Sequence, residues 1–203
     1  LLTLYLTNAR GLTARDAGAV VSYFGLGLMA AALLGGKLAD TIGRKRTMML
    51  ALLGGSAVTL AVGLASSTTA ISVLVFFMAF INELYRPAVA AFVADVVPPS
   101  SRLAAYSFLY WGTNIGFAAA SVLGGLIADV RFLALFVLDA ATTAVYGVIV
   151  WLRVPETKPA RAANHSSATD AAASPLRDPT FLLFVAIHLL LAIVPYQSVV
   201  TLA

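Results

Sequence analysis

The sequence predicts an all-α membrane protein, a bundle of spanning helices. Hydrophobic residues make up 61% of the 203 residues and charged residues only 11%, and the mean hydropathy is +0.94. A soluble domain carries about a quarter charged residues, so one core cannot bury this much apolar surface and lipid must be its solvent. The apolar residues also fall into runs of about 20, the length that crosses a bilayer. Short basic connections separate most of these runs.

The apolar runs place the helices in order along the chain. An apolar stub at 1–7 comes first, and spanning helices are predicted at 16–37, 47–66, 70–94, 102–127, 132–153 and 179–201. Segment 155–178 differs, because it opens on two prolines and continues in Ala, Ser, Thr, Asn and Asp. Such a composition cannot bury a core and predicts a flexible linker. We therefore expect an amino-terminal helical half with a truncated first helix (1–154), an interdomain linker (155–178) and the truncated start of a second half (179–203).

Basic residues in the connections orient the bundle. One side collects Lys37, Arg44, Lys45, Arg46, Arg102, Arg153, Lys158, Arg161 and Arg177. The other side has Arg10, Arg15 and Arg131. The positive-inside rule places the richer side, with the linker, in the cytoplasm. The protein is then a multi-pass protein of the cell membrane, and the alanine-rich chain indicates a bacterial cytoplasmic membrane.

The connection at 36–46 has the most specific pattern, Gly-Lys-Leu-Ala-Asp-Thr-Ile-Gly-Arg-Lys-Arg. Gly36 and Gly43 allow a close backbone approach or a positive φ in a tight turn. Asp40 lies at a helix end, within reach of Arg44 if the turn folds back. Lys45 is expected to face anionic headgroups. Three cations alone would predict a plain basic loop, but the acid and the two glycines make the pattern more specific.

This connection resembles the pattern G-x-L-A-D-x-x-G-R-K/R of major facilitator superfamily transporters. The resemblance implies the six-helix amino-terminal half of such a transporter, built from inverted three-helix repeats. Residues 35–40 and 124–129 have weakly similar sequences, which agrees with an internal repeat. In the family, the acid of this motif and an acid ending the fourth helix hold the two halves together on the cytoplasmic side. The resemblance thus implies a conformational lock of the outward-open state, made of Gly36, Asp40, Gly43, Arg44, Lys45 and Asp95. Alternatively, Asp95 only ends its helix before two prolines.

Helix 70–94 carries polar residues near its middle. Asn82, Glu83 and Arg86 lie where an ionised side chain costs about 2.5–3.5 kcal/mol. Glu83 and Arg86 are three positions apart and share a helix face, as do Asn82 and Arg86 at four. Pro87 lacks an N–H, so the carbonyl of Glu83 loses its helical partner and a kink is predicted. A freed carbonyl is tolerated against protein or water but not lipid, so we expect these residues to face a cavity.

Two roles are open for the charged pair. Glu83 and Arg86 either neutralise each other for folding alone or act in transport, and we favour transport because an apolar pair would fold more cheaply. Arg86 would then bind substrate or tune the proton affinity of a carrier, and Glu83 would be that carrier. Arg86-Pro87-Ala88 resembles the fourth-helix arginine motif of proton-driven members of the superfamily. The role of Glu83 is inferred from its charge.

Two further helices contribute candidate residues. Asp139 is a second buried acid, either a second protonatable site or one satisfied by a threonine on its own helix. Tyr110 and Asn114 share a face of helix 102–127 and either line the cavity, where aromatic walls suit flat or cationic substrates, or pack against a neighbouring helix. Drug antiporters of the family carry G-x-x-x-G-P-x-x-G-G in this helix. Ala120 and Ser121 replace its central Gly-Pro, so the kink that accompanies antiport is not predicted.

The sequence favours a proton-coupled secondary transporter that exports a small drug-like or sugar-like solute by alternating access. Uptake by proton symport and a transport-inactive membrane sensor are the alternatives. An enzyme is not expected, because the two histidines are far apart in the sequence and no catalytic or metal-ligating spacing appears. The partners implied are the lipid bilayer, a small-molecule substrate and protons, with no nucleic acid and no cofactor. We expect a monomer.

Overall fold

A computed structural model describes residues 2–128, 132–157, 179, 182–183 and 186–187. Every regular element in these residues is helical, as the sequence predicts. The chain divides into two compact units, and the larger, Leu2 and Leu4–Pro159, holds all the elements described below. The predicted linker beyond Thr157 and most of the predicted helix 179–201 lie outside the described residues, so the proposed domain boundaries stay predictions.

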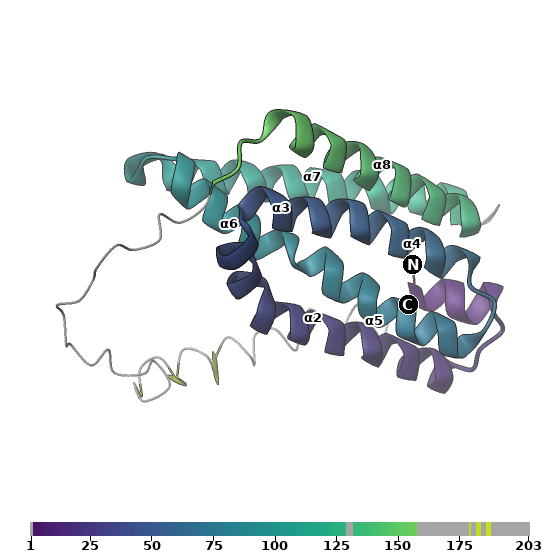
Figure 1. The fold of residues 1–203 in the computed structure, drawn as a ribbon. Helices are drawn as coiled ribbons and strands as arrows, with labels where there is room; N and C mark the ends of the chain where they lie inside the picture. Colours follow the sequence, from purple (N-terminus) through teal and green to yellow (C-terminus); the bar gives the residue numbers. More distant parts are fainter. Residues whose placement is uncertain (1, 129–131, 158–178, 180–181, 184–185, 188–203) are drawn as a thin grey trace. The chain divides into compact units, whose positions relative to one another are not determined.

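The larger unit is a succession of helices joined by short connections (Figure 1). It comprises α1 (Leu2–Leu4), the π-helix η1 (Tyr5–Ala9), α2 (Ala14–Ile42), α3 (Arg44–Met49), the π-helix η2 (Leu50–Gly54), α4 (Gly55–Leu64), α5 (Thr68–Glu83), α6 (Tyr85–Val96), the 3₁₀ turn η3 (Pro99–Ser101), α7 (Arg102–Ala128) and α8 (Phe132–Arg153). α3, η2 and α4 follow one another without a break and form one rod, Arg44–Leu64.

Four of the described helices are long and apolar enough to cross a membrane: Ala14–Ile42, Arg44–Leu64, Thr68–Val96 and Phe132–Arg153. They correspond to the predicted helices at 16–37, 47–66, 70–94 and 132–153. α7, with 27 residues, matches the predicted helix at 102–127. The predicted fold class, an all-α membrane protein, is therefore confirmed.

Close helix packing places α2 against α5 and α6. The two helices α2 and α5 lie side by side along their length (Figure 1). A Cβ on Gly27 would collide with the backbone of Phe76, and one on Gly35 would come within 2.7 Å of the Pro87 ring. Small residues at these positions let the helix backbones approach, as is common in membrane bundles.

The span Thr68–Val96 bends where the sequence predicts a kink. α5 ends at Glu83 and α6 begins at Tyr85, and the N–H of Leu84 donates to Ile81 in a tightened turn. Pro87 has no N–H for the carbonyl of Glu83, and its ring crowds that carbonyl. The ring packs toward Gly35 of α2, so the bend is buried in protein on that side.

The connection at 36–46 is much shorter than predicted. α2 continues to Ile42, α3 begins at Arg44, and the turn is Gly43 alone, at φ 107°. Polar residues near this helix end remain part of α2. The Thr41 hydroxyl, for example, donates to the carbonyls of Lys37 and Leu38. The expectation of a special backbone at Gly36 is wrong: it lies within α2, with open space where its Cβ would be.

Candidate functional site

Arg44 binds two carboxylates at one end of the bundle. Its Nη1 lies 2.9 Å from Oδ1 of Asp40 and its Nε 3.0 Å from Oδ2 of Asp95. Nη1 also donates to the carbonyl of Ala39 at 3.0 Å. We call Asp40, Arg44 and Asp95 the Arg44 cluster. It joins α2, α3 and α6, so the structure brings together three of the four charged residues that the resemblance implies.

The cluster surrounds a buried cation. The Arg44 side chain is 7% exposed, whereas those of Asp40 and Asp95 are 62% and 31% exposed. A buried guanidinium needs acceptors for its donors, and here two acids and a carbonyl accept from Nε and Nη1. The planar fork of arginine suits several acceptors at once. The arrangement therefore fastens α6 to the α2–α3 turn by hydrogen bonds to a single side chain.

A further acid, Glu156, follows the C-terminal end of α8 and contacts this end of the bundle. Oε1 of Glu156 accepts the N–H of Lys45 at 3.0 Å, and Oε2 accepts the N–H of Arg46 at 3.2 Å. The carbonyl of Thr157 accepts the N–H of Arg44 at 3.2 Å. We call these three hydrogen bonds the Glu156 cap. Sequence reasoning missed it, because Glu156 stands in a polar linker-like segment and no local spacing relates it to residues about 110 positions earlier.

A charged pair lies near the bend in the span Thr68–Val96. Nε of Arg86 is 3.0 Å from Oε1 of Glu83, as the three-residue spacing predicts. The Arg86 side chain is 77% exposed and that of Glu83 29%. Asn82 is exposed on the adjoining turn of α5, and its amide oxygen occupies the space that a Cβ on Gly55 would take. Because the exposed guanidinium lies within a membrane span, it must face water or protein rather than lipid.

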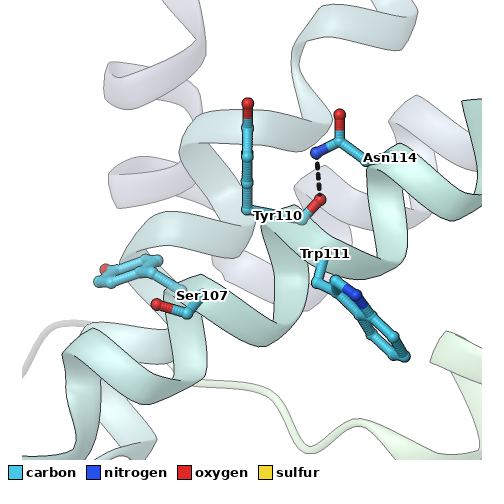
Figure 2. Close-up of a pocket in the computed structure, with 5 residues that line it drawn as sticks. Ser107, Tyr110, Trp111 and Asn114 are labelled. Carbon is cyan, nitrogen blue, oxygen red and sulfur yellow. Dashed lines mark hydrogen bonds between the residues drawn. The ribbon is translucent and has the colours of Figure 1, made fainter.

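α7 presents an aromatic groove of about 610 Å³, lined by Tyr106, Ser107, Tyr110, Trp111 and Asn114 (Figure 2). Tyr110 and Asn114 extend from the same side of α7, as predicted, and Trp111 from another. Nδ2 of Asn114 donates to the carbonyl of Tyr110, one turn earlier in α7, at 2.7 Å. The Tyr106 hydroxyl donates to the carbonyl of Ala90 at 2.9 Å and so ties α7 to α6.

Asp139 lies on an exposed face of α8, not in the core as predicted. The neighbouring Ala140 faces α4 instead, where its carbonyl accepts from Ser56. The Thr142 hydroxyl donates to the backbone carbonyls of Leu138 and Asp139 rather than to the carboxylate. Within the described part of the chain, no ion pair or hydrogen bond reaches the Asp139 carboxylate.

One interhelical contact was not anticipated from the sequence. The hydroxyls of Tyr85 on α6 and Tyr146 on α8 share a hydrogen bond, and their rings meet edge to face at 5.8 Å. Tyrosines in apolar helices give no pairing signal, so this contact depends on how α6 and α8 pack.

The sequence matches the family model described as Major Facilitator Superfamily over residues 1–203, and the chain belongs to that superfamily. It is thus a multi-pass membrane protein of a transporter family. The Na⁺, Li⁺, K⁺/H⁺ antiporter of Planococcus maritimus is 33% identical over 129 residues, 61% of this chain and 30% of that protein. The quinolone resistance protein NorA of Staphylococcus aureus (strain MRSA252) is 30% identical over 131 residues, 64% of this chain and 33% of NorA.

A solved structure is similar as well. The crystal structure of a mutant of the peptide transporter POT in complex with sulfate matches with a TM-score of 0.65 and 27% identity. The match covers 74% of this chain and 32% of POT. The chain spans less than half the length of the curated relatives it matches.

Proposed function

We propose that the full-length protein is a proton-coupled secondary transporter that exports a small drug-like or sugar-like solute by alternating access. The observation that carries the proposal is the Glu83–Arg86 pair, whose guanidinium is exposed in a bent membrane span. A charged pair kept at that depth is costly, and a purely structural pair belongs in the protein interior. The quinolone resistance of NorA and the cation/proton antiport of the Planococcus protein support drug export and proton coupling.

In this mechanism, the exposed faces of α6 and α7 contribute one wall of the central cavity. Arg86 attracts the anionic carboxylate of Glu83, and protonation of Glu83 releases the guanidinium for substrate. Tyr110 and Asn114 line the α7 side, where an aromatic face and an amide oxygen suit a flat or cationic solute. Asp139 is a second protonatable group, because no described cation neutralises it.

The Arg44 cluster is the conformational lock in this proposal. With the basic end of the bundle in the cytoplasm, Arg44 holds α6 to the α2–α3 turn while the transporter is outward-open. Loss of either carboxylate favours the inward-open state. Gly43 supplies the turn that brings Arg44 back toward Asp40, and Lys45 lies at the membrane surface.

Reconstitution of the full-length protein in liposomes containing a pH dye tests the proposal. Candidate drugs and sugars are added one at a time. Proton movement opposite to solute that Glu83→Gln abolishes supports antiport with Glu83 as carrier. Asp16→Asn is the matched control, because Asp16 is an exposed acid at the start of α2 whose hydrogen bonds, among the described residues, are those with its helix-cap residue Thr13.

Proton symport for uptake is the second candidate. It is favoured by α7, which runs as one unbroken helix through Ala120 and Ser121, where drug antiporters have Gly-Pro. Proton movement in the same direction as solute would establish it. Silence across the panel, from protein shown to be folded, would instead favour a transport-inactive sensor.

A further inference from the structure

The Glu156 cap joins the end of the described helical half to the Arg44 cluster. We propose that Glu156 is a positioning residue of the lock: by capping the rod Arg44–Leu64, it fixes Arg44 in place and ties the start of the predicted linker to the cluster. The inference rests on the proposed function, because it concerns the lock that this function requires.

The cap satisfies three N–H groups at the start of the rod. The first N–H groups of a helix have no partner within it. Here the N–H groups of Arg44, Lys45 and Arg46 all donate to residues 156–157. A carboxylate in this position also faces the positive end of the helix dipole. The amino-terminal turn of the rod is therefore held by a segment that follows α8.

Gly43 admits this carboxylate. A Cβ at position 43 would lie 2.5 Å from Oε1 and 2.9 Å from Oε2 of Glu156. The same residue has φ 107°, which side chains disfavour. Gly43 thus both makes the turn and leaves room for the acid.

The bonds to the backbone matter more than the pairing with side chains. Nε of Arg46 is 4.0 Å from Oε2 of Glu156, and the Arg46 side chain is 71% exposed. An exposed pair at that distance contributes little, whereas hydrogen bonds from N–H groups to a carboxylate are charge-assisted and strong. Neutralising Glu156 therefore weakens the cap even when Arg46 is kept.

Arg44 is held from two sides as a result. Thr157 binds its backbone N–H, while Asp40 and Asp95 bind its side chain. A displacement of the chain after α8 reaches the backbone of Arg44 directly through the cap. We expect release of Glu156 to loosen the cluster and to raise the inward-open population.

The test uses the full-length protein with a cysteine introduced by Ser107→Cys. Ser107 lines the groove near the start of α7, and the 203 residues contain no native cysteine. The rate of its modification by a membrane-impermeant thiol reagent in inside-out vesicles reports the inward-open state. Glu156→Ala should raise this rate about fivefold, the effect of losing one helix cap. Glu156→Asp should restore part of the difference and Asp16→Asn should change nothing.

Asp95→Asn separates this inference from the lock itself. If Asp95→Asn speeds modification and Glu156→Ala does not, the inference is wrong and the lock stands. If Asp95→Asn has no effect, the lock fails, and an effect of Glu156→Ala then cannot act through it. The double substitution should be no faster than the faster single one, since both act on one cluster; additive effects overturn the inference.

Two controls exclude general unfolding. A cysteine at Val62, which is fully buried in the core of the unit, should stay unreactive in every variant. Hydrogen exchange at the amides of Lys45 and Arg46 should accelerate in Glu156→Gln, which keeps the size of the side chain. Unchanged exchange at these amides contradicts the cap.

Discussion

At the scale of single residues, position 43 decides how α2 is followed by α3. Gly43 combines a positive φ with a space already filled by the Glu156 carboxylate. Gly36, seven residues earlier in the same motif, is helical and open. Two glycines that look equivalent in the sequence therefore have different physical roles.

We expect Gly43→Ala to destabilise the protein by about 1–3 kcal/mol, because it forces a side chain into a disfavoured backbone region and against an acid. Gly36→Ala is the matched control and should be neutral or slightly stabilising, since alanine suits a helix better than glycine. Thermal unfolding in detergent, followed by tryptophan fluorescence, measures both. Equal unfolding midpoints for the two variants would refute the assignment.

The second prediction at this scale concerns Arg44. Arg44→Lys should cost about 2–3 kcal/mol, because one ammonium cannot hold two acids and a carbonyl in the arginine geometry. Arg46→Lys, at an exposed side chain, should cost less than about 0.5 kcal/mol. Denaturant midpoints of the two purified variants measure these losses of stability. A similar loss in both variants would argue against a buried, multiply bonded Arg44.

At the scale of elements, the bend between α5 and α6 lies at Leu84, between Glu83 and Arg86. The sequence predicts it correctly, because Pro87 removes a hydrogen bond wherever the helix packs. The predicted loop at 36–46 is wrong in length, because charged residues at the membrane surface remain helical when solvated. Asp139 was predicted to be buried but is exposed, because its place in an apolar run does not show which face of the helix meets a neighbour.

Pro87→Ala should straighten the span Thr68–Val96 and reduce transport. Alanine restores the N–H that the carbonyl of Glu83 lacks, so α5 and α6 can continue as one helix. Spin labels at the exposed positions Val73 and Val96 report the bend, and their separation should increase in the variant. Pro99→Ala, in the exposed turn before α7, should leave that distance unchanged. The same distance in Pro87→Ala as in the parent protein would show that packing against α2 maintains the bend.

At the scale of the whole molecule, the order and length of the helices were largely predictable, because apolar runs of spanning length dominate the sequence. The ion pair within the charged motif at 36–46 was predictable from the four-residue spacing of Asp40 and Arg44 and from the resemblance to the family pattern. The Glu156 cap and the Tyr85–Tyr146 contact were not, since each joins segments far apart in the chain. Such contacts depend on the packed bundle and leave no local pattern.

Sidedness is testable at this scale. Ser66 and Ser100 are exposed in connections at opposite ends of the span Thr68–Val96, and a cysteine can be placed at either one. In intact cells, an impermeant thiol reagent should modify the cysteine of Ser66→Cys and spare that of Ser100→Cys, as the distribution of basic residues requires. Inside-out vesicles should give the reverse pattern. Modification of Ser100→Cys alone in intact cells would invert the proposed topology.

The single-residue turn at Gly43 has a consequence for chain length. Each residue added to a helix rotates the rest of that helix by about 100°, and only Gly43 separates α2 from the rod that begins at Arg44. One inserted or deleted residue between Asp40 and Arg44 would turn the guanidinium away from Asp95 and carry the cap donors away from Glu156. Unlike most surface connections, this one should therefore tolerate no change of length, even where its individual residues can be replaced.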